Sequence, residues 1–84
     1  MTNKEILKKK IIYRSMHRGT KEMDLLLGSF VKRYINTFTT IELEVLERLL
    51  LIEDELISKW YFNRNQNEII PINKVSSLLK NFKL

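Results

Sequence analysis

The chain has 84 residues, 44% of them apolar and 30% charged, and carries a formal net charge of +5 at pH 7, a composition typical of one small folded domain spanning residues 1–84. It contains no cysteine, which excludes disulfides, thiolate catalysis and cysteine-ligated metal centres. Its apolar runs are far shorter than the roughly 20 residues of a membrane span and no signal peptide is visible, so we expect a cytoplasmic protein without membrane insertion.

Two glycines and a single proline leave few places for strands to turn, so we expect a compact all-α bundle of about five short helices. The first helix opens with a capping-box pair, Thr2 and Glu5. It ends before Gly19, because glycine adopts the left-handed conformation of a helix C-terminus at little cost. The inward-facing residues of this helix are Leu7, Ile11 and Tyr13 or Arg14.

A second helix opens at Thr20, whose hydroxyl can cap it. Gly28 lies within this helix, where it is expected to let a neighbouring helix approach closely. The helix carries an apolar stripe with the spacing of a core-facing helix: Met23, Leu26, Leu27, Phe30 and Tyr34.

Three further helices follow. The capping-box pair Thr39 and Glu42 starts the third helix. The acidic cluster 53–55 begins the fourth, because carboxylates favour the positive end of a helix dipole. The last helix follows Pro71. Residues 64–67 are expected to form an exposed loop, and a hairpin around residues 68–72 is an alternative that lacks a partner strand. The apolar faces of these helices are Leu43, Leu46, Leu49 and Leu50; Leu56, Ile57, Trp60 and Tyr61; and Ile72, Val75, Leu78, Leu79 and Phe82.

Charge is distributed unevenly along the chain. Residues 1–21 contain seven Lys or Arg residues against one Glu, whereas the rest of the chain is nearly neutral. Such a segment is typical of a surface that meets nucleic acid, lipid or an acidic protein patch. A nucleic-acid-binding helix–turn–helix across Gly19 is one alternative, although Glu22 and Asp24 stand where base-reading residues belong. Membrane-surface binding by residues 4–14 ranks last, because the bundle needs their apolar side chains for its core.

Catalytic groups are scarce in this sequence. His17 is the only histidine, which argues against a histidine-rich metal site or a nucleophile–histidine–acid arrangement. Neither a GxGxxG motif nor a phosphate-binding P-loop occurs. We therefore expect that the chain is not an enzyme, and that it does not hold FAD or a nucleotide stably on its own.

The most distinctive segment runs from Arg14 to Asp24 and gathers charged groups around Gly19. One interpretation is an ordinary junction between two helices, in which Arg18 and Glu22 form a surface ion pair worth at most about 1 kcal/mol. Composition alone favours this interpretation, because charged turns are common. The other interpretation is functional: Gly19 allows a partner backbone to come close, while Arg18 and Glu22 present a charged pair to it.

Residues 17–24, with the sequence HRGTKEMD, resemble the RGxxE motif, in its fuller form RRGxxELD, of the SdhE family of flavinylation factors. This family is also called succinate dehydrogenase assembly factor 2. The resemblance covers most of the chain, roughly residues 4–82. It departs most at residues 64–70. The further matches are Phe30 and Tyr34 to an aromatic pair, residues 49–54 to an LLxxxD stretch, and residues 56–60, which include Trp60, to a DLxxWL segment.

The resemblance implies a bacterial assembly factor, monomeric when free, that binds the flavoprotein subunit of succinate dehydrogenase or of the related fumarate reductase. It implies that the factor promotes covalent attachment of FAD to a histidine of that subunit. Arg18, Gly19 and Glu22 would face the partner, flanked by Asp24 and by His17, which stands where the family frequently has arginine. A bulky residue at Gly19 is expected to abolish docking while leaving the bundle folded. The predicted partner-binding residues are Arg18, Gly19, Glu22, His17, Asp24, Arg14 and Tyr34.

Overall fold

The computed structural model describes residues 2–63 and 70–84, which form five helices and no strand. The all-α fold expected from the sequence is confirmed. The loop expected at residues 64–67 lies outside the described residues, and residues 70–72, the described part of the alternative hairpin, are not a strand. The helices are α1 (Asn3–Met16), α2 (Lys21–Tyr34), α3 (Thr40–Leu50), α4 (Asp54–Asn63) and α5 (Lys74–Asn81).

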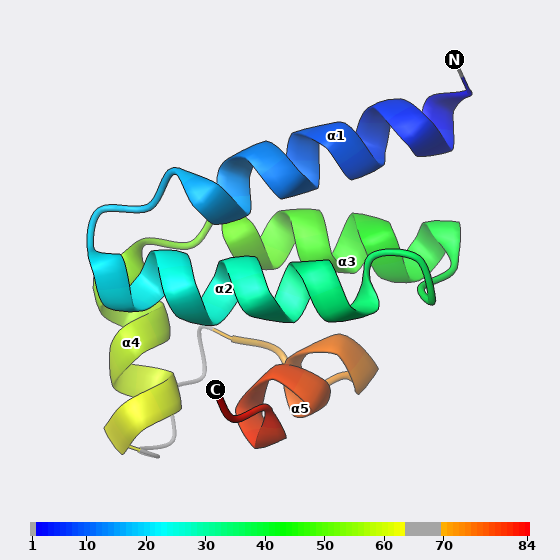
Figure 1. The fold of residues 1–84 in the computed structure, drawn as a ribbon. Coiled ribbons are helices and arrows are strands. Elements are labelled where there is room, and N and C mark those ends of the chain that lie inside the picture. The colour runs from blue at the N-terminus through cyan, green and yellow to red at the C-terminus, as the bar shows by residue number, and fades with distance from the viewer. Residues whose placement is uncertain (1, 64–69) are drawn as a thin grey trace.

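The first three helices lie side by side, and α4 and α5 close the bundle on the side away from α1 (Figure 1). α1 packs against both α2 and α3, and α5 packs against α3. α4 begins at the end of the bundle where α1 turns into α2, and it runs away from α1. The α1–α2 and α3–α4 connections therefore meet at one end of the molecule.

Side-chain caps fix where four of the helices begin. Thr2, Thr20 and Thr39 each accept a hydrogen bond from the backbone N–H three residues further on, as the sequence predicts. A fourth cap, Asn73, forms a reciprocal capping box with Ser76 and sets the start of α5 at Lys74. The pattern of apolar residues does not indicate this cap, because it places Ile72 on the helix.

The core is built from the predicted apolar stripes, with two exceptions. Of the two alternatives for the inner face of α1, Tyr13 is 63% exposed and Arg14 is half-buried. Ile72 is 96% exposed, because it precedes the Asn73 cap, and Ile70, at 3% exposed, is buried instead. None of the helices in the described ranges has the length and apolar content that a membrane span requires. The buried residues that the stripes predict are Ile11, Met23, Leu26, Leu27, Phe30, Leu43, Leu46, Leu49, Leu50, Ile57, Trp60, Val75 and Leu79.

Candidate partner-binding corner

The segment of residues 17–24, which we name the corner, joins α1 to α2 beside the connection between α3 and α4 (Figure 1). α1 ends at Met16, and its C-cap, His17, has φ −124°. Gly19 does not adopt the left-handed conformation that the sequence predicts. That prediction is wrong because carboxylates from α2 and α4, rather than a glycine cap, hold the backbone N–H groups of Arg18 and Gly19.

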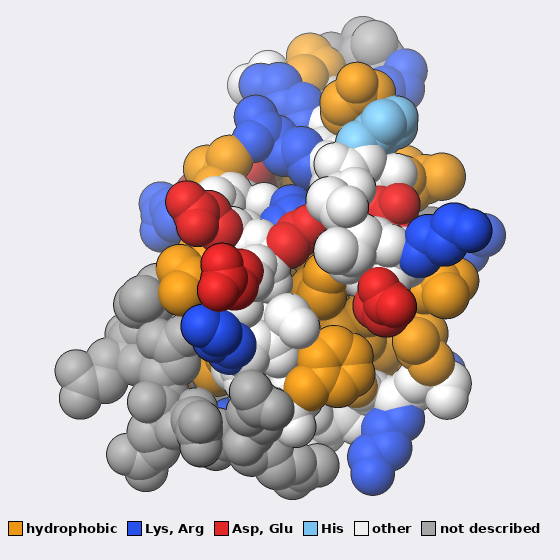
Figure 2. Space-filling view, turned by 90° about the vertical axis from the view of Figure 1, so that its left-hand side faces the viewer, with side chains coloured by type: hydrophobic (Ala, Val, Ile, Leu, Met, Phe, Trp, Pro, Cys, Tyr) orange, Lys and Arg blue, Asp and Glu red, His pale blue; other side chains and the backbone are white. Residues whose placement is uncertain are grey.

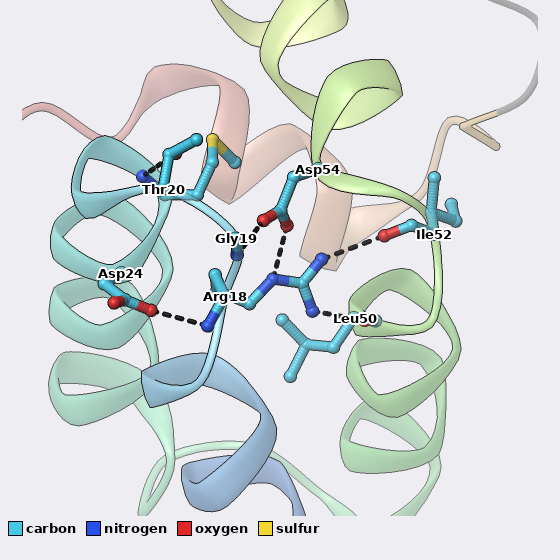
Figure 3. A network of polar contacts seen from close by, with 8 residues as sticks. Arg18, Gly19, Thr20, Asp24, Leu50, Ile52 and Asp54 are labelled. Atoms are coloured by element: carbon cyan, nitrogen blue, oxygen red, sulfur yellow. Dashed lines mark hydrogen bonds and ion pairs between the residues drawn. The ribbon is translucent and has the colours of Figure 1, made fainter.

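Arg18 points into the molecule, as Figure 3 shows. Its Nε–H donates to Oδ1 of Asp54 at 2.5 Å, and its terminal nitrogens donate to the carbonyl oxygens of Leu50 at 2.5 Å and Ile52 at 2.9 Å. The side chain is only 9% exposed. Carbonyl groups at a helix end lack partners within the helix, and the planar guanidinium serves several acceptors at once. Arg18 therefore joins the end of α3 to the start of α4, and the predicted surface pair with Glu22 is not formed.

Asp54, the first residue of α4, bridges Arg18 and Gly19. Its second oxygen, Oδ2, accepts the backbone N–H of Gly19 at 2.5 Å (Figure 3). A Cβ atom added to Gly19 would lie 3.1 Å from this oxygen, which is closer than ordinary van der Waals contact. The chain's own fold thus gives a reason for glycine at this position. We name the contacts among Arg18, Gly19 and Asp54 the latch.

Asp24 and Thr20 hold the corner from the first turn of α2. Oδ1 of Asp24 accepts the backbone N–H of Arg18 at 2.7 Å, and the Thr20 hydroxyl accepts the N–H of Met23 at 3.3 Å. Asp24 is half-buried. Its carboxylate shapes the corner, and the contact with a partner that the sequence predicts for it stays a prediction.

Glu22 is the motif residue whose charge remains open to solvent. It lies in the first turn of α2 and is exposed, and its side chain makes no hydrogen bond or ion pair within residues 2–63 and 70–84. Figure 2 views this end of the molecule: carboxylates gather over the first turns of α2 and α4, and basic side chains lie on α1 above them. Glu22 can therefore accept hydrogen bonds from, or pair with, a group on a partner.

His17 is exposed beside this acidic surface (Figure 2). Its Nδ1 lies 2.7 Å from the carbonyl oxygen of Tyr13 and acts as the donor, because a carbonyl oxygen only accepts. The imidazole also stacks on the Tyr13 ring with 3.9 Å between ring centroids. These contacts fix the ring and leave its Nε2 available.

The structure separates the two remaining predicted residues. Arg14 is half-buried on α1, one helical turn before the corner. Tyr34 lies at the other end of α2, roughly 20 Å from the corner at 1.5 Å per residue. Its ring stacks on Phe38 with a centroid separation of 5.6 Å and packs against Phe30. A partner contact through Tyr34 stays a prediction, but it would not lie on the same face as Glu22.

A small hollow adjoins the corner between α1 and α2. It has a volume of about 190 Å³, and Met16, Leu25 and Gly28 are among its lining residues. Met16 and Leu25 are 58% and 60% exposed. A Cβ atom on Gly28 would meet the Ser15 carbonyl oxygen at 3.8 Å, an ordinary contact, so the helices do not need glycine there for close approach. Gly28 instead leaves the hollow open.

Asp54 was not among the predicted site residues. The acidic cluster 53–55 is explained locally as the start of a helix, so the cluster by itself gives no reason to look for a distant partner of Asp54. The available signal was the motif arginine itself, because an arginine that is buried needs a carboxylate partner. The LLxxxD stretch ends on Asp54 and provides that carboxylate.

The corner does not resemble a metal centre. No group of three or more His, Asp or Glu side chains that could hold a metal ion occurs in the described part of the chain. Each buried side-chain nitrogen or oxygen in that part has a hydrogen-bond partner. The exposed groups of the corner, Glu22 and His17, offer charge and hydrogen bonding to a partner.

Comparisons with known proteins match this chain to one family. The family described as "Flavinator of succinate dehydrogenase" matches residues 9–83. The "FAD assembly factor SdhE" of Acetobacter pasteurianus is 33% identical over 73 residues, covering 87% of this chain and 64% of the relative. The mitochondrial "Succinate dehydrogenase assembly factor 2" of Scheffersomyces stipitis is 46% identical over 56 residues, covering 67% of this chain and 38% of the relative. The chain thus spans less than two thirds of these relatives. No solved structure matches it significantly.

Proposed function

Because the chain belongs to the family of succinate dehydrogenase flavinators, we propose that it binds the flavoprotein subunit of succinate dehydrogenase, or of fumarate reductase, and promotes covalent attachment of FAD. The resemblance noted at residues 17–24 is confirmed at the level of the family. The relatives are named as assembly factors, which supports an accessory role rather than catalysis. The bacterial cytoplasm and the monomeric state stay predictions.

The observation that carries the proposal is the exposed carboxylate of Glu22 on a corner whose other motif residues are tied down. Arg18 and Gly19 are held by Asp54, and Thr20 caps the helix that bears Glu22. Glu22 therefore stands at a defined place without an internal partner. An unpaired carboxylate on an anchored helix start is suited to recognising a basic or hydrogen-bonding group of a partner protein.

The surroundings of Glu22 have the anatomy of a protein interface. The hollow beside it is walled by the exposed apolar side chains of Met16 and Leu25. Charged residues, including Lys32 on the hollow's edge, surround these apolar groups. Interfaces of this kind place an apolar contact at the centre and polar groups at the rim.

The physical contribution of docking would be positional. We propose that the factor binds best to the arrangement of the partner in which its histidine and the flavin ring are aligned, so that docking raises the population of the reactive geometry. Glu22 would orient the partner's histidine or a neighbouring group by hydrogen bonding. The partner would hold the FAD, and we propose no stable FAD binding by this chain.

The charge of Arg18 suggests that it contacts a carboxylate of the partner, but its contacts within the chain favour a structural role in the corner. A bidentate pair with a partner carboxylate would cost its contacts with Asp54, Leu50 and Ile52. We therefore propose that Arg18 acts from inside the corner and that Glu22 and His17 make the outward contacts.

The proposal is tested by co-expressing the chain with the flavoprotein subunit and measuring the fluorescence of covalent flavin in the denatured subunit. We expect wild-type factor to raise the signal and Glu22→Ala to abolish most of the increase without changing its circular dichroism spectrum. Glu44→Ala is the matched control, because Glu44 is exposed on α3. A factor that neither binds the subunit nor changes its flavin content would contradict the proposal. Salt-dependent retention on DNA would then be the next measurement.

A further inference from the structure

The carboxylate of Asp54 divides its two oxygens between two motif residues, Arg18 and Gly19. Oδ1 accepts Nε–H of Arg18, and Oδ2 accepts the backbone N–H of Gly19, each at 2.5 Å (Figure 3). The partners are 36 and 35 residues away in sequence. In the described residues, these contacts and the two from Arg18 to the carbonyl groups of Leu50 and Ile52 are the polar links between the two connections at this end of the bundle.

We propose that Asp54, which lies outside the RGxxE motif, is a positioning residue of the docking corner. It holds Arg18 and Gly19 so that Glu22 meets the partner in a fixed orientation. This inference rests on the proposed function. It assigns to Arg18 and Gly19 an indirect part in docking, through the latch, and leaves direct contact to Glu22.

The latch fixes the position of the Glu22 backbone, because Arg18 and Gly19 lie on the same short segment as Glu22. Gly19 precedes Thr20, the N-cap of α2, and Glu22 is in the first turn of that helix. Without the Asp54 carboxylate this segment would lose its link to α4, and of the two backbone N–H groups of Arg18 and Gly19 only that of Arg18 would keep a carboxylate acceptor, on Asp24. A segment that becomes ordered only on binding loses conformational entropy, which lowers affinity. A segment that is already ordered in the free protein avoids this loss.

Arg18 would not keep the corner in place without Asp54. Its side chain is 9% exposed, and Asp54 is the carboxylate that forms an ion pair with it. Removing the carboxylate leaves a nearly buried cation with only neutral acceptors, a state that favours movement of the side chain toward water. That movement would release the contacts with the end of α3 and change the shape of the corner.

The experiment uses purified flavoprotein subunit without covalent flavin, excess FAD and increasing concentrations of factor. The initial rate of covalent attachment gives a maximal rate and a half-saturating factor concentration. We compare wild type with Asp54→Asn, which keeps the size of the side chain and removes its charge. Glu55→Gln is the matched control, because Glu55 lies one residue further along α4 and pairs only with the exposed Lys59.

We expect Asp54→Asn to raise the half-saturating concentration about tenfold, the equivalent of one charge-assisted hydrogen bond, with the maximal rate unchanged. Glu55→Gln should match wild type in both values. The factor concentration is corrected for the folded fraction from circular dichroism, so a loss of fold alone leaves the corrected half-saturating concentration unmoved. An Asp54→Asn factor with the wild-type half-saturating concentration would overturn the inference. If wild-type factor does not accelerate attachment, the proposed function fails and the inference fails with it.

A second measurement needs no variant. Gly19 is an exposed residue outside any helix, so its amide should exchange rapidly with solvent unless Asp54 protects it. We expect slowed hydrogen exchange at the Gly19 amide in the free wild-type protein. Exchange at the rate of an unprotected amide would overturn the latch, even if Asp54→Asn cannot be obtained folded.

Discussion

At the scale of single residues, the two glycines have different physical roles. A Cβ atom added to Gly19 would lie 3.1 Å from Asp54 Oδ2. A Cβ atom added to Gly28 would lie at ordinary contact distances, 3.8 and 3.9 Å, from its nearest neighbours. We expect Gly19→Ala to lower the free energy of unfolding by about 1–2 kcal/mol, because the carboxylate must shift and weaken charge-assisted hydrogen bonds. Urea denaturation measures this change. Unchanged stability with lost docking would instead support the clash with a partner that the sequence suggested.

Gly28→Ala is expected to have the opposite effect on stability. Alanine in the middle of a helix is favoured over glycine by roughly 0.5–1 kcal/mol, and its methyl group would meet no close contact. The same methyl group would reduce the hollow beside the corner. We therefore predict a higher melting temperature together with weaker binding to the flavoprotein, measured by calorimetry and by titration. Unchanged binding would place the hollow outside the docking face.

The corner was predictable from the sequence only in part. The motif residues 17–24 are contiguous, so their gathering at one place follows from the chain itself. The inward direction of Arg18 and its pairing with Asp54 depend on contacts across 36 residues, which local patterns do not contain. Tyr34 was included because it follows the motif in sequence, yet the length of α2 separates it from the corner.

At the scale of elements, the best-predicted features are the helix starts, because a cap involves residues only three apart. Thr39 and Glu42 illustrate this: they form the complete capping box at the start of α3 that their spacing predicts. One start was missed: α5 begins at Lys74, behind a cap at Asn73 that the apolar pattern does not show. The end of α1 before Gly19 was predicted, but how this turn is closed was not, because carboxylates from α2 and α4 hold its backbone N–H groups.

The α3 capping box also makes stability depend on pH. The backbone N–H of Thr39, and then Lys74 at 2.9 Å, lower the pKa of the Glu42 carboxyl below its ordinary value. A depressed pKa contributes stability that is present above the pKa of the unfolded chain and is lost as the pH falls through the folded value. We predict that Glu42→Gln is less stable than wild type at neutral pH and that the difference shrinks on acidification. Parallel urea titrations at several pH values measure it, and a constant difference would contradict the assignment.

At the scale of the whole molecule, the chain combines a basic first helix with an acidic end. The basic residues of the first 21 positions lie mainly on α1, and carboxylates gather at the first turns of α2 and α4 (Figure 2). The all-α fold and the family were predictable, because periodic apolar stripes and a motif in the correct context are properties of the sequence. The polar contact between Arg18 and Asp54, which joins the α1–α2 and α3–α4 connections at one end of the bundle, was not predictable, because it depends on the assembled bundle.

The most direct test of the central claim is the rate at which FAD becomes covalently attached to purified flavoprotein subunit in the presence and absence of this chain. We expect faster attachment with wild-type factor, and a rate near that of the subunit alone with Glu22→Ala at the same folded concentration. Equal rates with and without wild-type factor would contradict the claim. A Glu22→Ala factor as active as wild type would leave the function standing and remove the corner as its site.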